Sequence, residues 1–290
     1  KQAQQWLALH QAHSPARTDP DCAAAYDSSF QAMAAVCATA RRLHVIGLGC
    51  GSGQKEAQLL RSLQRPDRPS ITYTPCDVST ALVLTAFQAA LEVLPERDCS
   101  PLVCDLIGAG DLGKIIETSI SPEAVRIVTF LGMIPNFEPH TILPRLADLL
   151  HPGDHLLLSA NLAPGGDYLE GIRKILPLYD NALTREWLMT FLLELGVERS
   201  DGELRFVIED GPGGGGLKRI AAHFGFTRAR AIEVGDERFA FQLGESIRLF
   251  FSYRHTPDRI RDLLRPYGMA VLEQWIIPSG EEGVFLCQRR

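Results

Sequence analysis

Short apolar runs alternate with helix-like segments along the first half of the chain, after a region at residues 1–42 that has a helical pattern. Turn residues separate these runs, as at Pro152–Asp154 before the last of them. Strands that alternate with helices indicate a parallel sheet with helices on both faces. The predicted strands are Leu43–Leu48, Ile71–Cys76, Leu102–Cys104, Val125–Leu131 and His155–Ala160, and the helices after the first two are Gln54–Leu63 and Ala81–Leu94.

The end of the chain has a different pattern. Apolar runs at Ala270–Ile277 and Val284–Cys287 flank the turn-rich segment Pro278–Gly283, which predicts an antiparallel hairpin that completes the sheet. A parallel sheet closed by such a hairpin is the layout of class I methyltransferases. We therefore expect an α/β fold with a Rossmann-like sheet of this kind.

The segment between the fifth strand and the hairpin is about a hundred residues long, more than one crossover helix needs. Its first part, Tyr168–Leu195, is helix-like, and its second part, Leu204–Gly244, contains short strands such as Arg228–Val234 and Arg238–Gln242. The glycine run Gly211–Gly216 predicts a loop between two strands. We expect an inserted α+β lobe that covers the substrate side of the sheet. The predicted domains are a core with N-terminal helices at 1–165, the substrate lobe at 166–257, and a C-terminal helix and hairpin at 258–290.

Charge and composition narrow the class of partner. The formal net charge is −6 and the basic residues form no long run, which argues against DNA, RNA or an anionic membrane and favours a small substrate. Seven cysteines occur without a CxxC pair, so we expect reduced thiols and no metal site. The chain has neither a long apolar span nor a signal pattern. We expect a cytoplasmic monomer or weak homodimer.

A glycine-rich loop follows the first predicted strand, in the segment Val45–Gly53. Glycine permits positive φ angles and a close approach of the backbone to a ligand, and the helix that follows offers unpaired N–H groups. The spacing does not fit GxGxxG, which argues against a nicotinamide dehydrogenase. The alternating GxGxG fits the loop that packs against the methionine part of S-adenosylmethionine (SAM). The candidate cofactor residues of this loop are Gly47, Gly49, Gly51, Ser52 and Lys55.

Polar residues stand at the ends of the next three strands. Asp77, followed by Val78, is placed to bind ribose hydroxyls, and Asp105, followed by Leu106, is placed to contact adenine. Each aspartate could instead cap a helix or turn. Asn136 follows the fourth strand, where it could reach the reacting group or serve as a turn residue.

These motifs together resemble the histidine-specific methyltransferase family, which supplies the betaine of ergothioneine biosynthesis and includes the ergot-alkaloid dimethylallyltryptophan N-methyltransferase. The resemblance covers roughly residues 40–290. In the core, Leu48–Lys55 resembles the family's Gly-Ser-Gly-Thr-Ser-Glu-Lys loop, Cys76–Ser79 resembles its Asp-Val-Ser motif, and Asp105 matches its adenine-site acid. Phe130–Phe137 resembles its Phe-Leu-Gly-Ser-x-Ile-Gly-Asn-Phe signature. Later in the chain, Tyr179–Asn181 resembles its Tyr-Asp element, and Gly244–Ser246 with Ser252–Arg254 resembles its Gly-Glu…Ser-x-Lys segment.

The resemblance implies roles for several residues. Asn136 and Tyr179 would bind the α-amino and α-carboxylate groups of an amino-acid substrate, and Ser252 would lie in the side-chain pocket. Two residues before that serine the histidine enzymes carry a glutamate that grips the imidazole, but this chain has Phe250. A phenyl ring is no acceptor, so a less polar or aromatic side chain fits better than histidine. Tyr26–Phe30 is a shortened approximation of the family's N-terminal Tyr-Asp-x-x-Gly-Ser element.

The sequence thus predicts a SAM-dependent N-methyltransferase. Its acceptor is expected to be the amino group of a small amino acid or a specialised metabolite derived from one, with Tyr179 and Asn136 orienting the amine. Two alternatives stay open, namely histidine methylation with a different imidazole contact, and a non-catalytic SAM-binding protein.

Overall fold

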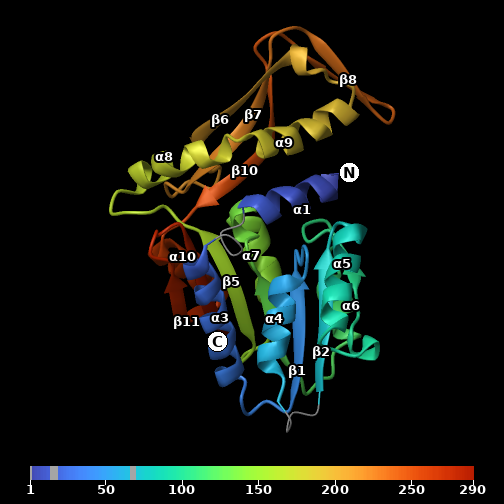
Figure 1. The fold of residues 1–290 in the computed structure, drawn as a ribbon, viewed down its shortest axis with the longest axis vertical. Helices are drawn as coiled ribbons and strands as arrows, with labels where there is room; N and C mark the ends of the chain where they lie inside the picture. The colour runs from blue at the N-terminus through green and yellow to red at the C-terminus, as the bar shows by residue number, and fades with distance from the viewer. Residues whose placement is uncertain (1, 14–18, 66–69) are drawn as a thin grey trace. The chain divides into compact units, whose positions relative to one another are not determined.

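The computed structural model describes residues 2–13, 19–65 and 70–290, and the described chain forms two compact units. The core unit contains the described residues of 15–162 together with 255–290. The other unit, called the lobe below, contains 163–254 together with the N-terminal helix. Figure 1 shows the elements of both units.

A seven-stranded sheet forms the centre of the core unit, in the order β11-β12-β5-β4-β1-β2-β3. The pairs among β1 to β5 are parallel, whereas β12 runs antiparallel to both β5 and β11. This confirms the predicted Rossmann-like sheet closed by a C-terminal hairpin. The strands are β1 (Arg42–Leu48), β2 (Ser70–Asp77), β3 (Leu102–Val103), β4 (Val125–Phe130), β5 (His155–Asn161), β11 (Met269–Ile276) and β12 (Glu282–Arg289).

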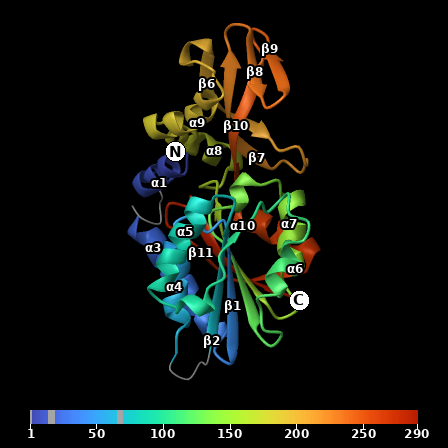
Figure 2. The same cartoon turned by 90° about the vertical axis from the view of Figure 1, so that its right-hand side faces the viewer.

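Helices cover both faces of this sheet, as the buried strand patterns require (Figure 2). One face packs against α3 (Pro20–Val36), α4 (Gln54–Leu63) and α5 (Thr80–Leu91). The other packs against α6 (Leu112–Glu117), α7 (Pro139–Asp148) and α10 (Pro257–Leu264). Because the strands between them are parallel, the polar residues after β1, β2 and β4 come to one edge of the sheet.

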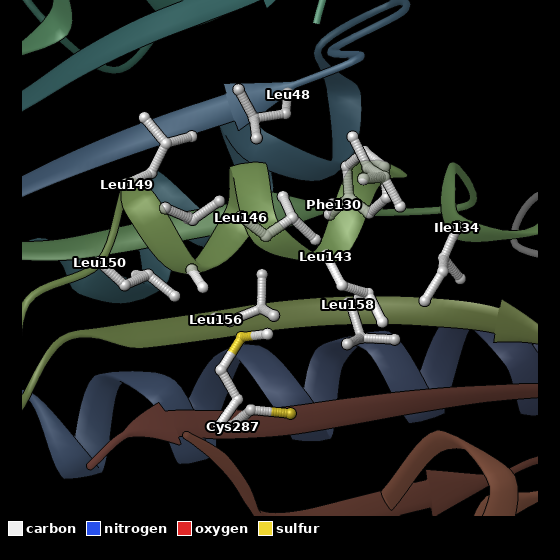
Figure 3. Close-up of a cluster of buried hydrophobic side chains, with 14 of the residues drawn as sticks. Leu48, Phe130, Ile134, Leu143, Leu146, Leu149, Leu150, Leu156, Leu158 and Cys287 are labelled. Carbon is white, nitrogen blue, oxygen red and sulfur yellow. The ribbon is translucent and has the colours of Figure 1, made fainter. Parts of the chain in front are cut away.

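The apolar core under α7 holds this edge in place. Leu146 of α7 packs against Leu156 and Leu158 of β5, with Phe130 of β4 and Cys287 of β12 alongside (Figure 3). Leu146, Leu156 and Leu158 are fully buried. Burying each such side chain contributes about 1.5–3 kcal/mol, so the ends of β4 and β5 have a rigid support.

In its described residues, the lobe contains a three-stranded antiparallel sheet, a separate hairpin and three α-helices. Its strand order is β10-β7-β6, with β8 and β9 paired apart from it. The glycine run lies between β6 and β7, as predicted. The elements are α1 (Gln2–His13), α8 (Tyr168–Tyr179), α9 (Ala182–Glu194), β6 (Gly202–Asp210), β7 (Lys218–Phe226), β8 (Arg230–Val234), β9 (Glu237–Phe241) and β10 (Ser246–Arg254).

The structure differs from the sequence expectation at three points. The helix-like segment Tyr168–Leu195 breaks into two helices because Asn181 caps the second one, accepting a hydrogen bond from the Thr184 N–H at 2.9 Å. The lobe strands β6, β7 and β10 have nine residues each, longer than expected. Helix α1 packs against α9 of the lobe, whereas the expected domain boundaries put it in the core.

Candidate active site

The glycine loop after β1 has the backbone that only glycine adopts readily. Gly49, Gly51 and Gly53 have φ angles of 63°, 52° and 70°. A Cβ on Gly53 would lie 2.5 Å from the Cα of Ala86 in α5, so the loop also packs tightly against its neighbour helix. The side chain of Met133 lies directly against Gly49.

Gly47 and Cys50 have structural reasons for their places. Gly47 does not have a positive φ, and a Cβ there would lie 2.8 Å from the Tyr73 hydroxyl oxygen. Gly47 is a predicted cofactor residue, and the absence of a side chain there also leaves room for the Tyr73 ring below the loop. Burial, followed by the nearby Glu56, raises the pKa of the Cys50 thiol. A raised pKa disfavours the thiolate, which is the reactive form of cysteine.

Asp77 joins the end of β2 to the glycine loop. It is 8% exposed; its Oδ2 accepts a hydrogen bond from the Gly51 N–H at 3.3 Å and its Oδ1 accepts one from the Ser79 N–H at 2.9 Å. The carboxylate is thus held beside the loop where the sequence placed it. The adjacent Val78 is 72% exposed, which leaves an apolar side chain at the same sheet edge.

Asp105 and Leu106, the two residues predicted to bind the cofactor after β3, are arranged differently from Asp77 and Val78. Asp105 is exposed, and its Oδ1 accepts a hydrogen bond from the Ile107 N–H at 2.9 Å, which is the turn-capping role that its type also predicts. Leu106, which we expected at the cofactor, is 7% exposed and packs into the apolar core.

Asn136 ends a short 3₁₀ helix, η2 (Ile134–Asn136), after β4. Its side chain is exposed, and its backbone N–H donates to the Met133 carbonyl at 2.9 Å. The turn before it is fixed by Ser159 of β5, whose Oγ accepts a hydrogen bond from the Gly132 N–H at 2.7 Å.

A buried polar cluster lies in the core unit around Tyr26 of α3. Its hydroxyl oxygen is 2.7 Å from the Lys55 Nζ, 2.7 Å from the Ser159 Oγ and 2.6 Å from the Glu282 Oε1. Sequence reasoning noticed Tyr26 only as a weak motif and missed Ser159 and Glu282. No local pattern signals this cluster, because its members come from four separate elements.

The lobe brings together the predicted substrate residues Tyr179 and Ser252. The Tyr179 hydroxyl donates to the Ser252 Oγ at 2.9 Å and accepts from the Arg254 Nη2 at 2.7 Å. Ser252 is 1% exposed and Arg254 is 6% exposed. A guanidinium therefore fixes the phenol that the sequence singled out.

Aromatic rings surround this group in the lobe. The Phe250 ring centroid lies 6.0 Å from that of Tyr179 and 5.8 Å from that of Trp187, in a tilted and an edge-to-face arrangement. Trp187 and Phe191 have a helical spacing that favours core positions, but Trp187 is only half-buried and Phe191 is 45% exposed. Phe250 itself is half-buried.

Two other kinds of site are missing from the part of the chain that the structure describes. Within residues 2–13, 19–65 and 70–290, no three His, Cys, Asp or Glu side chains gather where they could hold a metal ion. Across the same residues, no helix combines the length and apolar character that crossing a membrane requires.

The sheet order and the loop after β1 define the class I SAM-dependent methyltransferase fold. The SAM-dependent methyltransferase SibL has a similar fold, with a TM-score of 0.51 at 13% identity over 98% of this chain and 58% of that chain. The profile of the histidine-specific, SAM-dependent methyltransferase family matches residues 26–186 and 216–289. The chain therefore belongs to this family of SAM-dependent enzymes.

Two N-methyltransferases from Aspergillus species are similar to most of the chain. The N-methyltransferase imqF of Aspergillus flavus is 27% identical over 252 residues, which cover 82% of this chain and 66% of the relative. The N-methyltransferase fsqC of Aspergillus fumigatus is 21% identical over 248 residues, which cover 82% of this chain and 64% of the relative. The chain thus spans about two thirds of the length of these relatives.

Proposed function

We propose that the protein transfers a methyl group from SAM to the amino group of a small amino acid or amino-acid-derived metabolite, whose side chain is aromatic or otherwise less polar than imidazole. The names of the two fungal relatives support transfer to nitrogen. The observation that carries the substrate class is the aromatic cluster of Tyr179, Trp187 and Phe250 in the lobe, beside a buried Ser252.

The core residues fit the cofactor. Gly49 and Gly51 give the loop a backbone with positive φ angles that can approach the methionine part closely, and Asp77 presents a carboxylate for the ribose hydroxyls. Exposed Val78 would pack on the adenine, with Asp105 at its edge. SAM, when bound, supplies a sulfonium methyl group that is reactive without acid catalysis.

The task of the protein is then alignment and exclusion of water. The nitrogen lone pair must point along the bond to the methyl group, and the amine must be neutral at that moment. We assign the orientation of the amine to Asn136 and Tyr179. The contact between the Arg254 guanidinium and the Tyr179 hydroxyl leaves the phenol proton directed to Ser252, so that the hydroxyl position is fixed before substrate binds.

In this proposal, the phenyl ring of Phe250 makes histidine a poor substrate. A ring at this position offers dispersion and edge-to-face contacts to an aromatic group, worth about 0.5–1.5 kcal/mol beyond burial. An imidazole would lose its hydrogen bonds to water and gain no acceptor from the phenyl ring.

Removal of the Tyr179 hydroxyl tests the assignment of the lobe. We expect Tyr179→Phe to lower kcat/KM for the best aromatic amine about 3- to 10-fold, because one hydrogen bond worth about 0.5–1.5 kcal/mol is lost. The affinity for SAM, measured by calorimetry, should stay unchanged, because the cofactor residues lie in the core unit.

Tyr267→Phe is the matched control, because Tyr267 lies in the core unit between α10 and β11, in a 3₁₀ helix at Arg265–Tyr267. It should alter neither quantity. Equal kcat/KM for Tyr179→Phe and the unsubstituted enzyme would remove Tyr179 from the substrate site.

A further inference from the structure

The Tyr26 hydroxyl is the centre of a hydrogen-bonded chain in the core unit. Lys55 donates to its oxygen at 2.7 Å, and the hydroxyl lies 2.6 Å from the Glu282 Oε1. A carboxylate only accepts, so the single phenol proton is donated to Glu282. Ser159 shares a further hydrogen bond at 2.7 Å and accepts one from the Gly132 N–H. These hydrogen bonds therefore link the helix after the glycine loop, α4, to the turn after β4.

Most residues of this hydrogen-bonded network are buried away from water. Tyr26 is 2% exposed, Glu282 is 7% exposed and Ser159 is fully buried. Burial, and next the charge of Glu282, raises the pKa of Tyr26, so the phenol stays protonated. The buried Cys22 thiol donates to the second oxygen of Glu282 at 3.5 Å. These contacts hold the buried Glu282 carboxylate in one geometry.

Lys55 occupies a position that helices do not favour for a cation. It lies in the first turn of α4, where the N–H groups and the helix dipole favour negative charge. The Tyr26 side chain holds it there, with the Nζ 2.7 Å from the hydroxyl oxygen and 3.9 Å from the ring centroid. Both the ammonium and the helix N-terminus attract an anion at the end of the glycine loop.

We propose that Tyr26 is a positioning residue that, anchored by Glu282 and Ser159, holds the Lys55 ammonium for the carboxylate of the methionine part of the cofactor. The inference rests on SAM use by the family and on the cofactor residues assigned under Proposed function. It adds an interaction with the amino-acid end of SAM, and a nucleoside that lacks this end cannot make that interaction. The same chain fixes Gly132, and with it the turn that carries Asn136.

Two ligands separate this role from a merely structural one. S-adenosylhomocysteine has the carboxylate, whereas 5′-methylthioadenosine has the same nucleoside without the amino-acid end. By calorimetry, Tyr26→Phe should weaken binding of S-adenosylhomocysteine about 5- to 10-fold and change binding of 5′-methylthioadenosine less than about 2-fold. Lys55→Met, at a half-buried site where folding is less at risk, should show the same selectivity with a loss of about 10- to 30-fold.

The double variant completes the test. Because Tyr26 acts through Lys55, adding Tyr26→Phe to Lys55→Met should cause no further loss of S-adenosylhomocysteine affinity. Equal weakening of both ligands by either single variant, additive losses in the double variant, or unchanged S-adenosylhomocysteine affinity in Lys55→Met would overturn the proposal. Failure of the unsubstituted protein to bind either ligand would instead contradict the cofactor assignment itself.

Discussion

Asp77→Ala is expected to weaken binding of SAM and S-adenosylhomocysteine about 30- to 150-fold. The carboxylate is 8% exposed and holds the Gly51 and Ser79 N–H groups, so its oxygens point at the loop where the ribose would lie. Losing a charged acceptor for two hydroxyls costs about 2–3 kcal/mol. Isothermal calorimetry measures both affinities directly.

Two variants separate ribose binding from a general loosening of the loop. Asp77→Asn keeps one acceptor oxygen and should weaken binding of S-adenosylhomocysteine about 10-fold. Asp98→Ala removes an aspartate from the 3₁₀ helix at Glu96–Asp98, before β3, and should leave the affinity unchanged. If Asp77→Ala bound S-adenosylhomocysteine as tightly as Asp98→Ala does, the ribose assignment would be wrong.

The second large effect is expected at Phe250. In the unsubstituted protein, kcat/KM for L-histidine should be at least about 100-fold below that for the best aromatic amine, because a site that leaves buried polar groups unpaired discriminates strongly. Phe250→Glu should raise the ratio of histidine to aromatic-amine turnover about 100-fold. It supplies an acceptor for imidazole and removes the ring that contacts Tyr179 and Trp187. Competition between the two substrates in one reaction gives this ratio.

Phe250→Leu is the control, because it keeps the site apolar at similar size and should change the ratio less than about 10-fold. Efficient conversion of histidine to its trimethyl betaine by the unsubstituted protein would show the substrate inference to be wrong. An unchanged ratio in Phe250→Glu would show that position 250 does not read the side chain.

The core fold could be predicted because its signals are local. Each strand from β1 to β5 is an apolar run with turn residues around it, and the alternation with helices defines the sheet. The lobe strands were harder to see. In β10 a register shift between Arg248 and Phe250 interrupts the alternation of sides, and β7 has buried residues at successive positions. Neither strand keeps the period of two, which identifies a half-exposed strand, over its whole length.

The same distinction applies to the site. The glycine loop and Asp77 follow their strands directly, so sequence spacing alone brings them to one sheet edge. The contact of Tyr26 with Glu282 joins residues 256 positions apart, and the hold of Arg254 on Tyr179 joins residues 75 apart. Such contacts depend on strand pairing and helix packing, which leave no local pattern. Leu106 shows a further limit, since the sequence places it beside Asp105 but does not reveal that its side chain packs into the apolar core.

Transfer of a labelled methyl group tests the central claim most directly. The protein is incubated with SAM that carries a deuterated methyl group and with L-tryptophan, L-tyrosine, L-phenylalanine, their decarboxylated amines and L-histidine, and the products are identified by mass spectrometry. We predict that S-adenosylhomocysteine forms in step with an aromatic product that carries the label on its amino nitrogen, and that histidine remains largely unlabelled. A label on oxygen or carbon, preferential labelling of histidine, or tight S-adenosylhomocysteine binding without any labelled product would contradict the account.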